Sequence, residues 1–295
     1  MSADGLAAAE ALLTEALDGV PVSLREPCRR IAQAGGEWLR AGLLLAVAGR
    51  AWPGTSRRTA TAAAAVELLH LATLVHEDLL HEAPVRRGVP TINAKEGTTV
   101  ALLTGDLLIG LAHRLGATAG AGPLLGDALT ERCTGLSLEA DNRFHPEVDA
   151  TTALRIAELK TGTLLAAAGR LGAVVTAAPE DGLQEYGVAY GTALHLLDDI
   201  LDLGSSFAAG IVTLPAVHAL AAHPELRRLL RPGLDEAHRQ QAGELLATGV
   251  PPTLTTITQL LDRADAARPE LAEMTKRCRD SQLALMPRHR PVLNS

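Results

Sequence analysis

Three carboxylates lie at the C-terminal end of one apolar stretch of the chain, Gly187 to Asp202, which reads GVAYGTALHLLDDILD. Apolar residues recur in it at helical spacing, and Asp198, Asp199 and Asp202 then end the stretch. Asp198 and Asp202 are four residues apart and share one helix face, while Asp199 lies about 100° around the helix from Asp198. Hard divalent cations such as Mg²⁺ prefer carboxylate oxygens. The pattern therefore predicts a metal site, with a solvated acidic helix end as the alternative.

A second polar cluster closes another apolar stretch, in LLHLATLVHEDLLHEAPVRRG, and contains His76, Glu77, Asp78 and His81. Arg86 and Arg87 follow it closely. Guanidinium groups bind phosphate oxygens through a planar fork, so this arrangement suits a polyanion held between metal ions and arginines. The alternative is a basic turn that water solvates.

Lys160 and Thr161 interrupt a third apolar stretch, from Thr151 to Ala173. A buried ammonium group is costly without a partner, and a diphosphate would serve as one. The alternative is that the lysine extends along the helix and reaches water. In the stretch 98–115, Asp106 is interpreted as structural, and Gly105 beside it predicts close packing against a neighbouring helix.

Two glycines, Gly35 and Gly36, precede a helical pattern that contains Glu37 and Arg40. Backbone N–H groups at such a helix start could hold an anion. A Gly–Gly pair before a helix is also common where no ligand binds.

The elements that must position these residues are predicted to be helices of a single domain over residues 1–295. The chain is 47% hydrophobic but only 2% aromatic, and Ala and Leu are strong helix formers, so we expect an all-α fold. Pro84 should end the second helical pattern, and a short Gly/Ser/Ala loop should follow Asp202. The patterns cover residues 3–19, 58–82, 98–115, 124–142, 151–173 and 187–202.

Composition and charge argue against several other classes of protein. We expect no transmembrane span and a cytoplasmic location, because no unbroken apolar run reaches the roughly 18 residues that a spanning helix needs. Cys28, Cys133 and Cys278 are odd in number and lack C-x-x-C spacing, so we expect reduced thiols. The net charge of −7 gives no reason to expect nucleic acid as a partner.

Together these motifs resemble the trans-isoprenyl diphosphate synthases, the polyprenyl synthetases. The similarity runs from about Ala34 to Val217, and its most specific parts are LLDDILDL and HEDLLHEAPVRRGVPTINA, which are similar to the second and first aspartate-rich regions of the family. TGDLL and ELKTG match further family segments in the same order. The resemblance implies an isoprenoid-synthase-type antiparallel helical bundle around a deep apolar pocket. It also implies a homodimer, with a heterodimer with another synthase as the alternative.

The chemistry of the family follows from the same resemblance. In the family, Mg²⁺ ions bridge the two acidic motifs and the diphosphate of an allylic prenyl substrate, which helps that diphosphate to leave. The double bond of isopentenyl diphosphate then captures the allylic cation, while apolar walls keep water away from it.

Carried over by position, the family's functional groups fall on particular residues of this chain. Lys160, Arg86 and Asp198 would act in catalysis, with Lys160 and Arg86 on the allylic diphosphate and Thr161 and His195 in the same substrate site. The second diphosphate, from isopentenyl diphosphate or another acceptor, would face Arg40, His70 and Arg87. The implied metal ligands are Glu77, Asp78, His81, Asp198, Asp199 and Asp202. Mn²⁺ or another divalent metal is an alternative to Mg²⁺, because His81 brings a nitrogen donor.

Several positions depart from the family pattern. His81 stands where the first motif usually has a carboxylate, and Glu37 stands where a lysine usually faces the second diphosphate. His195 replaces a glutamine, and Ile211 stands where a lysine usually helps to close the site over the phosphates. These losses fall mainly on the acceptor side, so we expect ionisation of the allylic substrate to be better kept than condensation with isopentenyl diphosphate.

The expected substrate is a long prenyl chain. Ala72 and Thr73 lie about one turn before Glu77, at positions where bulky aromatics in the family stop growing chains near fifteen carbons. Both are small here, and Leu68 and Leu69 could form a deeper floor, so we expect a pocket for twenty carbons or more. The alternative is that Ala72 only allows close helix packing.

Functions of different classes fit these observations. One is a divergent prenyltransferase acting on chains of fifteen to twenty carbons or longer, with a terpene cyclase or a prenyltransferase to another acceptor as variants on the same fold. The low aromatic content, 2%, argues against the cyclase, because aromatic walls often stabilise cations. Another is a weakly catalytic or non-catalytic partner subunit of a synthase, and the last is a helical scaffold without a ligand.

Overall fold

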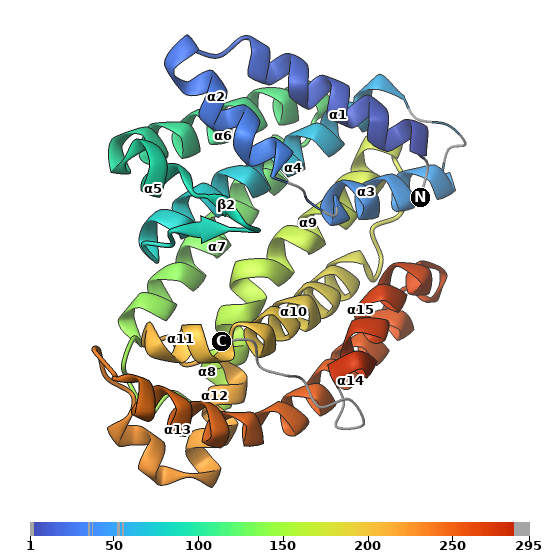
Figure 1. Cartoon of the computed structure of the whole chain (residues 1–295). Helices are drawn as coiled ribbons and strands as arrows, with labels where there is room; N and C mark the ends of the chain where they lie inside the picture. The colour runs from blue at the N-terminus through green and yellow to red at the C-terminus, as the bar shows by residue number, and fades with distance from the viewer. Residues whose placement is uncertain (1–2, 35, 37, 52–53, 55, 286–295) are drawn as a thin grey trace. The chain divides into compact units, whose positions relative to one another are not determined.

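The computed structural model describes residues 3–34, 36, 38–51, 54 and 56–285, and most of them are helical (Figure 1). The prediction of an all-α fold is confirmed. The chain forms two compact units. The first unit comprises residues 1–129 and 167–181, and the second comprises residues 130–166 and 182–295. The single domain over residues 1–295 stays a prediction.

Helix α4 (Arg57–Leu80) is the core of the first unit and covers most of the pattern expected at 58–82. Ser56 caps its start, because the Ser56 hydroxyl accepts a hydrogen bond from the backbone N–H of Thr59 at 3.1 Å. Residues 59–69 are all buried, and the alanines at 62–65 let neighbouring helices approach closely. Its neighbours in this unit are α1 (Ala3–Asp18), α2 (Val22–Gln33), α3 (Leu39–Ala51), α5 (Ile92–Glu96) and α6 (Thr98–Ala119).

A β-hairpin in the sequence VRRGVP was missed by the all-α expectation. Strands β1 (Val85–Arg86) and β2 (Val89–Pro90) pair in antiparallel fashion, with Arg86 opposite Val89. The two loop residues, Arg87 and Gly88, have φ angles of 52° and 76°, as a two-residue turn of type I′ requires. Left-handed backbone costs a non-glycine residue roughly 1–2 kcal/mol. The hairpin therefore fixes Arg87 in a conformation that it would not adopt by itself.

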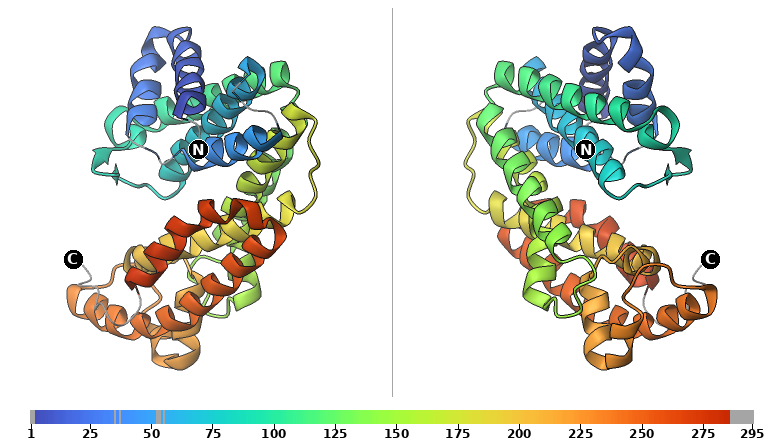
Figure 2. Two further views of the ribbon diagram at one scale, coloured as in Figure 1. Left: turned by 90° about the vertical axis from the view of Figure 1, so that its right-hand side faces the viewer. Right: turned by 90° about the vertical axis from the view of Figure 1, so that its left-hand side faces the viewer.

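Helix α10 (Leu183–Leu201) is the core of the second unit, where it packs against α14 (Val250–Ala267) and α15 (Ala272–Leu285) (Figure 2). The hydroxyls of Tyr186 and Tyr190 donate hydrogen bonds to the backbone carbonyls of Leu271 and Met274 at 3.1 and 2.8 Å. The remaining helices are α7 (Gly122–Asp141) and α9 (Thr163–Thr176), which the division between the units cuts, and α8 (Ala150–Ala157), α11 (Leu203–Ala208), α12 (Leu214–Ala222) and α13 (Glu236–Leu246).

The prediction of a loop directly after Asp202 is wrong, because helix α11 begins at Leu203. The backbone N–H of Ser206 donates to the carbonyl of Asp202 at 2.8 Å, which continues the helical hydrogen bonds. Leu203 and Phe207, four residues apart, are buried on one face. Burial of that apolar pair outweighs the weak helix propensity of the Gly and Ser residues between them.

Two helices, α4 and α6, are long and apolar enough to cross a membrane by length and composition alone. In α4 83% of the apolar window is buried inside the first unit, as in the core helix of a soluble protein, against 39% in α6. Leu102 and Leu103 of α6 are exposed large apolar residues. The absence of a membrane span stays a prediction. All three cysteines are free thiols, as predicted.

Candidate functional site

The second acidic motif lies at the C-terminal end of α10. Asp198 and Asp202 are exposed there, and the backbone N–H of Asp202 donates to the carbonyl of Asp198 at 2.9 Å across the last turn. This end of a helix carries partial negative charge, so each carboxylate is unfavourable by about 0.3–1 kcal/mol without a nearby cation. The last turn of α10 contains no basic residue. Two accessible carboxylates on adjoining turns can offer oxygens to a hard divalent cation.

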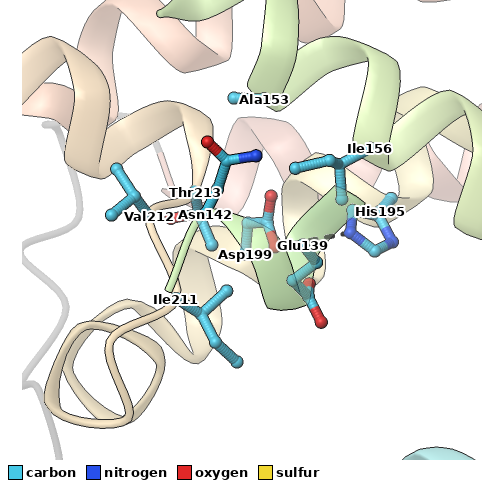
Figure 3. A pocket seen from close by; sticks show the side chains of 9 residues that line it. All are labelled: Glu139, Asn142, Ala153, Ile156, His195, Asp199, Ile211, Val212 and Thr213. Carbon is cyan, nitrogen blue, oxygen red and sulfur yellow. Dashed lines mark ion pairs between the residues drawn. The ribbon is translucent and has the colours of Figure 1, made fainter. Parts of the chain in front are cut away.

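Asp199 belongs instead to a partly buried polar cluster (Figure 3). Its Oδ1 lies 3.6 Å from Nε2 of His195, and the two side chains are only 14% and 15% exposed. The other ring nitrogen of His195, Nδ1, lies 2.8 Å from Oγ1 of Thr161. The imidazole thus links the acidic motif to the segment that carries Lys160.

Lys160 lies in a π-helical turn, Glu158–Gly162, between α8 and α9. π-Helical turns are rare and occur often at functional sites. Lys160 is 3% exposed, and its Nζ donates to Oε2 of Glu139 at 2.7 Å. Arg132 donates a hydrogen bond to the backbone carbonyl of Lys160. The alternative that Lys160 reaches water is therefore wrong, and its partner in the structure is a carboxylate of the chain.

Burial raises the pKa of the Asp199 carboxyl well above its usual value. The Lys160 ammonium opposes this shift, whereas the negative charges of Glu139, Asp198 and Asp202 add to it. The charged form of Asp199 is therefore disfavoured in this environment, and a bound cation would favour it.

A small pocket opens beside Asp199 and His195 (Figure 3). Ile211 lies on its wall at the position where a lysine was expected in the family pattern, and no lining residue is basic except His195. Thr213 is 7% exposed, and its Oγ1 has no hydrogen-bond partner within the described part of the chain. The lining residues are Glu139, Asn142, Ala153, Ile156, His195, Asp199, Ile211, Val212 and Thr213.

The first acidic motif ends α4 as the second ends α10. Glu77 and His81 are partly exposed, and the backbone N–H of His81 donates to the carbonyl of Glu77 at 3.0 Å. Asp78 differs, because it is 3% exposed and its Oδ1 accepts a hydrogen bond from Nε of Arg86 at 2.8 Å. Burial raises the pKa of Asp78, and the Arg86 guanidinium opposes the shift. Asp78 therefore anchors Arg86 of the hairpin, and Glu77 and His81 are the more accessible groups.

The predicted metal ligands are not gathered into a complete site within either unit. Among the residues that the structure describes, no three His, Cys, Asp or Glu side chains lie together as a protein metal site would need. Mg²⁺ is commonly held by one or two carboxylates, with water and substrate phosphates as further ligands, and the exposed pair at the end of α10 fits that mode. The six assigned ligands stay predictions.

The two arginines predicted to face the second diphosphate, Arg40 and Arg87, both belong to the first unit. A Cβ atom built on Gly36 would lie 3.5 Å from Nη1 of Arg87. Arg40 and Arg87 both lower the pKa of the Glu67 carboxyl, although burial, the largest influence, raises it. Glu67 accepts hydrogen bonds from the first-turn amides of α3, so these amides hold a carboxylate of the chain itself rather than standing open to an anion. Gly35 and Glu37 lie outside the described residues.

The residues assigned to chain length lie inside α4. Leu68, Leu69, Ala72 and Thr73 are all buried, and Oγ1 of Thr73 donates to the carbonyl of His70 at 2.7 Å. Their role in substrate length stays a prediction.

The close packing predicted at Gly105 is confirmed. A Cβ atom there would lie 2.1 Å from Nε2 of His76, so only glycine lets α6 approach the imidazole this closely. Nε2 of His76 also lies 3.6 Å from Oδ1 of Asp106.

Sequence reasoning missed two carboxylates of these clusters, Glu67 and Glu139. Both are buried, at 6% and 7% exposure. Glu67 interrupts an apolar helical pattern, where a carboxylate is costly unless it is satisfied, and the same signal that singled out Lys160 would have found it. Glu139 lies in a helix with other charged residues, such as Glu131 and Arg132, so its sequence gives no such signal.

Known proteins resemble this chain in sequence and in structure. The sequence pattern of the family described as Polyprenyl synthetase matches residues 21–247. The chain is 32% identical over 289 residues to nonaprenyl diphosphate synthase of Mycobacterium tuberculosis (strain ATCC 25618 / H37Rv), covering 91% of this chain and 86% of that protein. It is 34% identical over 235 residues to heptaprenyl diphosphate synthase component 2 of Geobacillus stearothermophilus, covering 74% and 73%.

Two solved structures give the same result for the fold. A decaprenyl diphosphate synthase from Rhodobacter capsulatus has a TM-score of 0.87 at 26% identity and covers 96% of this chain and 97% of its own. A polyprenyl synthase from Caulobacter crescentus CB15, complexed with calcium and isoprenyl diphosphate, has a TM-score of 0.86 at 26% identity, covering 95% and 94%.

Proposed function

This chain belongs to the polyprenyl synthetase family, and on that premise we propose that it ionises an allylic prenyl diphosphate in a metal-dependent step, which releases diphosphate. The double bond of isopentenyl diphosphate then bonds to the allylic cation, and loss of a proton completes the elongated prenyl diphosphate. The proposed allylic substrates have fifteen to twenty carbons or more. The observation that carries this proposal is the partly buried cluster of Lys160, His195 and Asp199 beside two accessible carboxylates at the end of α10. A chain that kept only the fold would have no reason to retain these costly charges.

The second unit is proposed to bind the diphosphate group of the allylic substrate and its metal ions. Asp198 and Asp202, with Asp199, would hold Mg²⁺ or Mn²⁺, which when bound neutralises charge developing on the leaving diphosphate. Lys160 adds a fixed positive charge, held in place by Glu139. Thr161 and His195 hydrogen-bond to each other beside it, so they keep one another oriented.

The first unit is proposed to bind diphosphate groups of both substrates. Glu77 and His81 are accessible at the end of α4 and would supply metal ligands. Arg86, held by Asp78, is proposed to bind the allylic diphosphate. The second diphosphate is assigned to Arg40, His70 and Arg87, of which Arg87 lies beside Gly36.

A partner subunit of a synthase is the second candidate function. It is favoured by His81, an imidazole in the first acidic motif, and by the similarity to a protein named as one component of a heptaprenyl diphosphate synthase. No comparable observation favours a terpene cyclase. The two tyrosines of α10, Tyr186 and Tyr190, are buried with their hydroxyls bonded to the backbone of residues 271 and 274.

A homodimer is proposed as the assembly. Leu102 and Leu103 expose apolar surface on α6, which a second copy would cover. A heterodimer with a synthase is the alternative. Sedimentation equilibrium of the purified chain would give the mass of a monomer if the homodimer is wrong. The proposed location is the cytoplasm, which cell fractionation would test.

Replacement of Asp198 by asparagine tests the metal role. Asp198→Asn keeps the shape of the side chain but removes one charged oxygen, so turnover of farnesyl diphosphate with isopentenyl diphosphate and Mg²⁺ should be abolished. Asp280→Asn, at an exposed acid of α15, is the matched control and should keep wild-type turnover. Unchanged activity in Asp198→Asn would remove this role.

A further inference from the structure

Glu67 is a buried carboxylate that the reaction proposed above does not use. It lies in the buried stretch of α4, is 6% exposed, and its Oε1 accepts a hydrogen bond from the backbone N–H of Ala41 at 2.9 Å. The backbone N–H of Arg40 also hydrogen-bonds to this carboxylate. A carboxylate in such a place is costly unless each of its oxygens is satisfied.

The two backbone amides that bind Glu67 show that it caps the start of helix α3. α3 begins at Leu39, so Arg40 and Ala41 belong to its first turn, where backbone N–H groups lack partners within the helix. Such groups are usually capped by Ser, Thr, Asp or Asn just before the helix, but the residue before Leu39 is Trp38, which has no side-chain acceptor. Glu67 supplies the missing acceptor from α4 and so fixes the start of α3.

Both arginines assigned to the second diphosphate favour the charged form of the same carboxylate. The positive charges of Arg40 and Arg87 lower the pKa of Glu67, although burial, the largest influence, raises it. Two guanidinium groups directed at one ligand repel each other before the ligand arrives, and a carboxylate near both reduces that repulsion.

Backbone strain marks the same place. Trp38 and Arg87 both have left-handed φ angles, 49° and 52°, which side chains of this size rarely adopt. Strained residues persist where surrounding contacts hold them, and they gather at ligand-binding sites. Trp38 directly precedes the turn of α3 that Glu67 caps, and Arg87 is one of the two arginines assigned to the second diphosphate.

We propose that Glu67 is a positioning residue of the acceptor-diphosphate site, which caps α3 and sets Arg40 and Arg87 at the spacing that binds isopentenyl diphosphate. This inference rests on the proposed function for the identity of the ligand. The opposite effect on binding is also conceivable and can be measured, because the carboxylate of Glu67 would repel a nearby diphosphate. If repulsion dominated, removal of the Glu67 charge would strengthen binding of isopentenyl diphosphate; if positioning dominates, removal weakens it.

Glu67→Gln is the test, because glutamine keeps an oxygen for the amide of Ala41 but loses the negative charge that offsets the positive charges of Arg40 and Arg87. The expected result is a rise of about tenfold in KM for isopentenyl diphosphate, with KM for farnesyl diphosphate within twofold of wild type. A lower or unchanged KM for isopentenyl diphosphate, or an equal rise for both substrates, would overturn the inference.

A double-mutant cycle separates positioning from general damage. In an Arg40→Ala background, the effect of Glu67→Gln on KM for isopentenyl diphosphate should be clearly smaller than tenfold, since one of the two arginines that Glu67 positions is gone. A tenfold effect that persists there contradicts a role through Arg40. Glu96→Gln breaks the ion pair between Glu96 and Arg30 in the same unit and is the matched control, with both KM values within twofold of wild type. If Glu67→Gln does not fold, Glu67→Asp decides by the same KM comparison.

A binding measurement keeps this inference distinct from the proposed function. Calorimetric titration with isopentenyl diphosphate, in Mg²⁺ and a thiolo analogue of farnesyl diphosphate that cannot ionise, gives a dissociation constant without turnover. Wild-type protein that binds but makes no product would refute the proposed function, while the effect of Glu67→Gln on that constant would still decide the role of Glu67. Equal constants for wild type and variant would overturn the inference.

Discussion

Two buried charged side chains, Lys160 and Asp78, are each paired with a group of opposite charge, whereas two carboxylates at the end of α10 remain accessible to a ligand. Lys160 is bound to Glu139, and Asp78 is bound to Arg86. Asp198 and Asp202 are exposed at a helix end that disfavours negative charge. Buried charges must be paired to be tolerated, and a bound cation would favour exposed carboxylates at such a helix end.

Removal of the Lys160 charge should destabilise the fold through Glu139. Lys160→Met removes the ammonium group that is bound to the buried Glu139 carboxylate, which should lower the free energy of unfolding by about 3 kcal/mol. Urea unfolding followed by circular dichroism measures the change. The double variant Lys160→Met/Glu139→Gln should recover most of the loss, because no unpaired charge remains, yet it should not recover turnover. Equal losses in the single and double variants would show that the pair does not act as a unit.

Glu37 is predicted to weaken binding of isopentenyl diphosphate, since it reverses the charge of the lysine usual in the family. A charge reversal about 4 Å from a phosphate is worth a few kcal/mol at an effective dielectric near 20, or at least about a hundredfold in affinity. Glu37→Lys should therefore lower KM for isopentenyl diphosphate by that factor. Glu10→Lys, at an exposed position of α1, controls for overall charge. A wild-type KM already in the low micromolar range would disprove the idea.

At the scale of elements, helical periodicity predicted most of what the structure contains. α4, α6, α7 and α10 cover the expected patterns within a few residues at each end. Periodicity failed where local structure depends on contacts across the chain. The hairpin needs left-handed backbone at Arg87, and α11 forms because Leu203 and Phe207 are buried, neither of which a local pattern reveals. The π-helical turn at Lys160 was likewise invisible, since its sequence continues an apolar helix.

Ala72 on α4 is predicted to set the length of the prenyl chain. A ring at this fully buried position, below Glu77, should block a tunnel along α4, so Ala72→Phe should stop products near fifteen carbons. Mass spectrometry of the products measures their length. Turnover of geranyl diphosphate is the control, because a short substrate does not reach Ala72. If the variant handles geranylgeranyl diphosphate as well as wild type does, the tunnel does not run past Ala72.

At the scale of the whole molecule, the family could be identified from the order of short motifs, whereas the partners of individual charges could not. Acidic clusters, paired arginines and a lysine stand in the expected order along the chain. In the structure, Lys160 and the first-turn amides of α3 hydrogen-bond to carboxylates of the chain, and Asp78 hydrogen-bonds to an arginine. Lys160 and Glu139 are 21 positions apart in the sequence, and Ala41 and Glu67 are 26 positions apart. Helical spacing relates only residues a few positions apart, so it could not predict these pairs.

Product analysis of the purified protein tests the proposed prenyltransferase activity most directly. The protein is incubated with Mg²⁺ and geranyl, farnesyl or geranylgeranyl diphosphate, each with and without isopentenyl diphosphate, and the products are identified by mass spectrometry. We predict elongated prenyl diphosphates only when isopentenyl diphosphate is present, with farnesyl and geranylgeranyl diphosphate as the better substrates, and none from Asp198→Asn. Cyclic hydrocarbons formed without isopentenyl diphosphate, or no product from any of the three substrates, would contradict this activity.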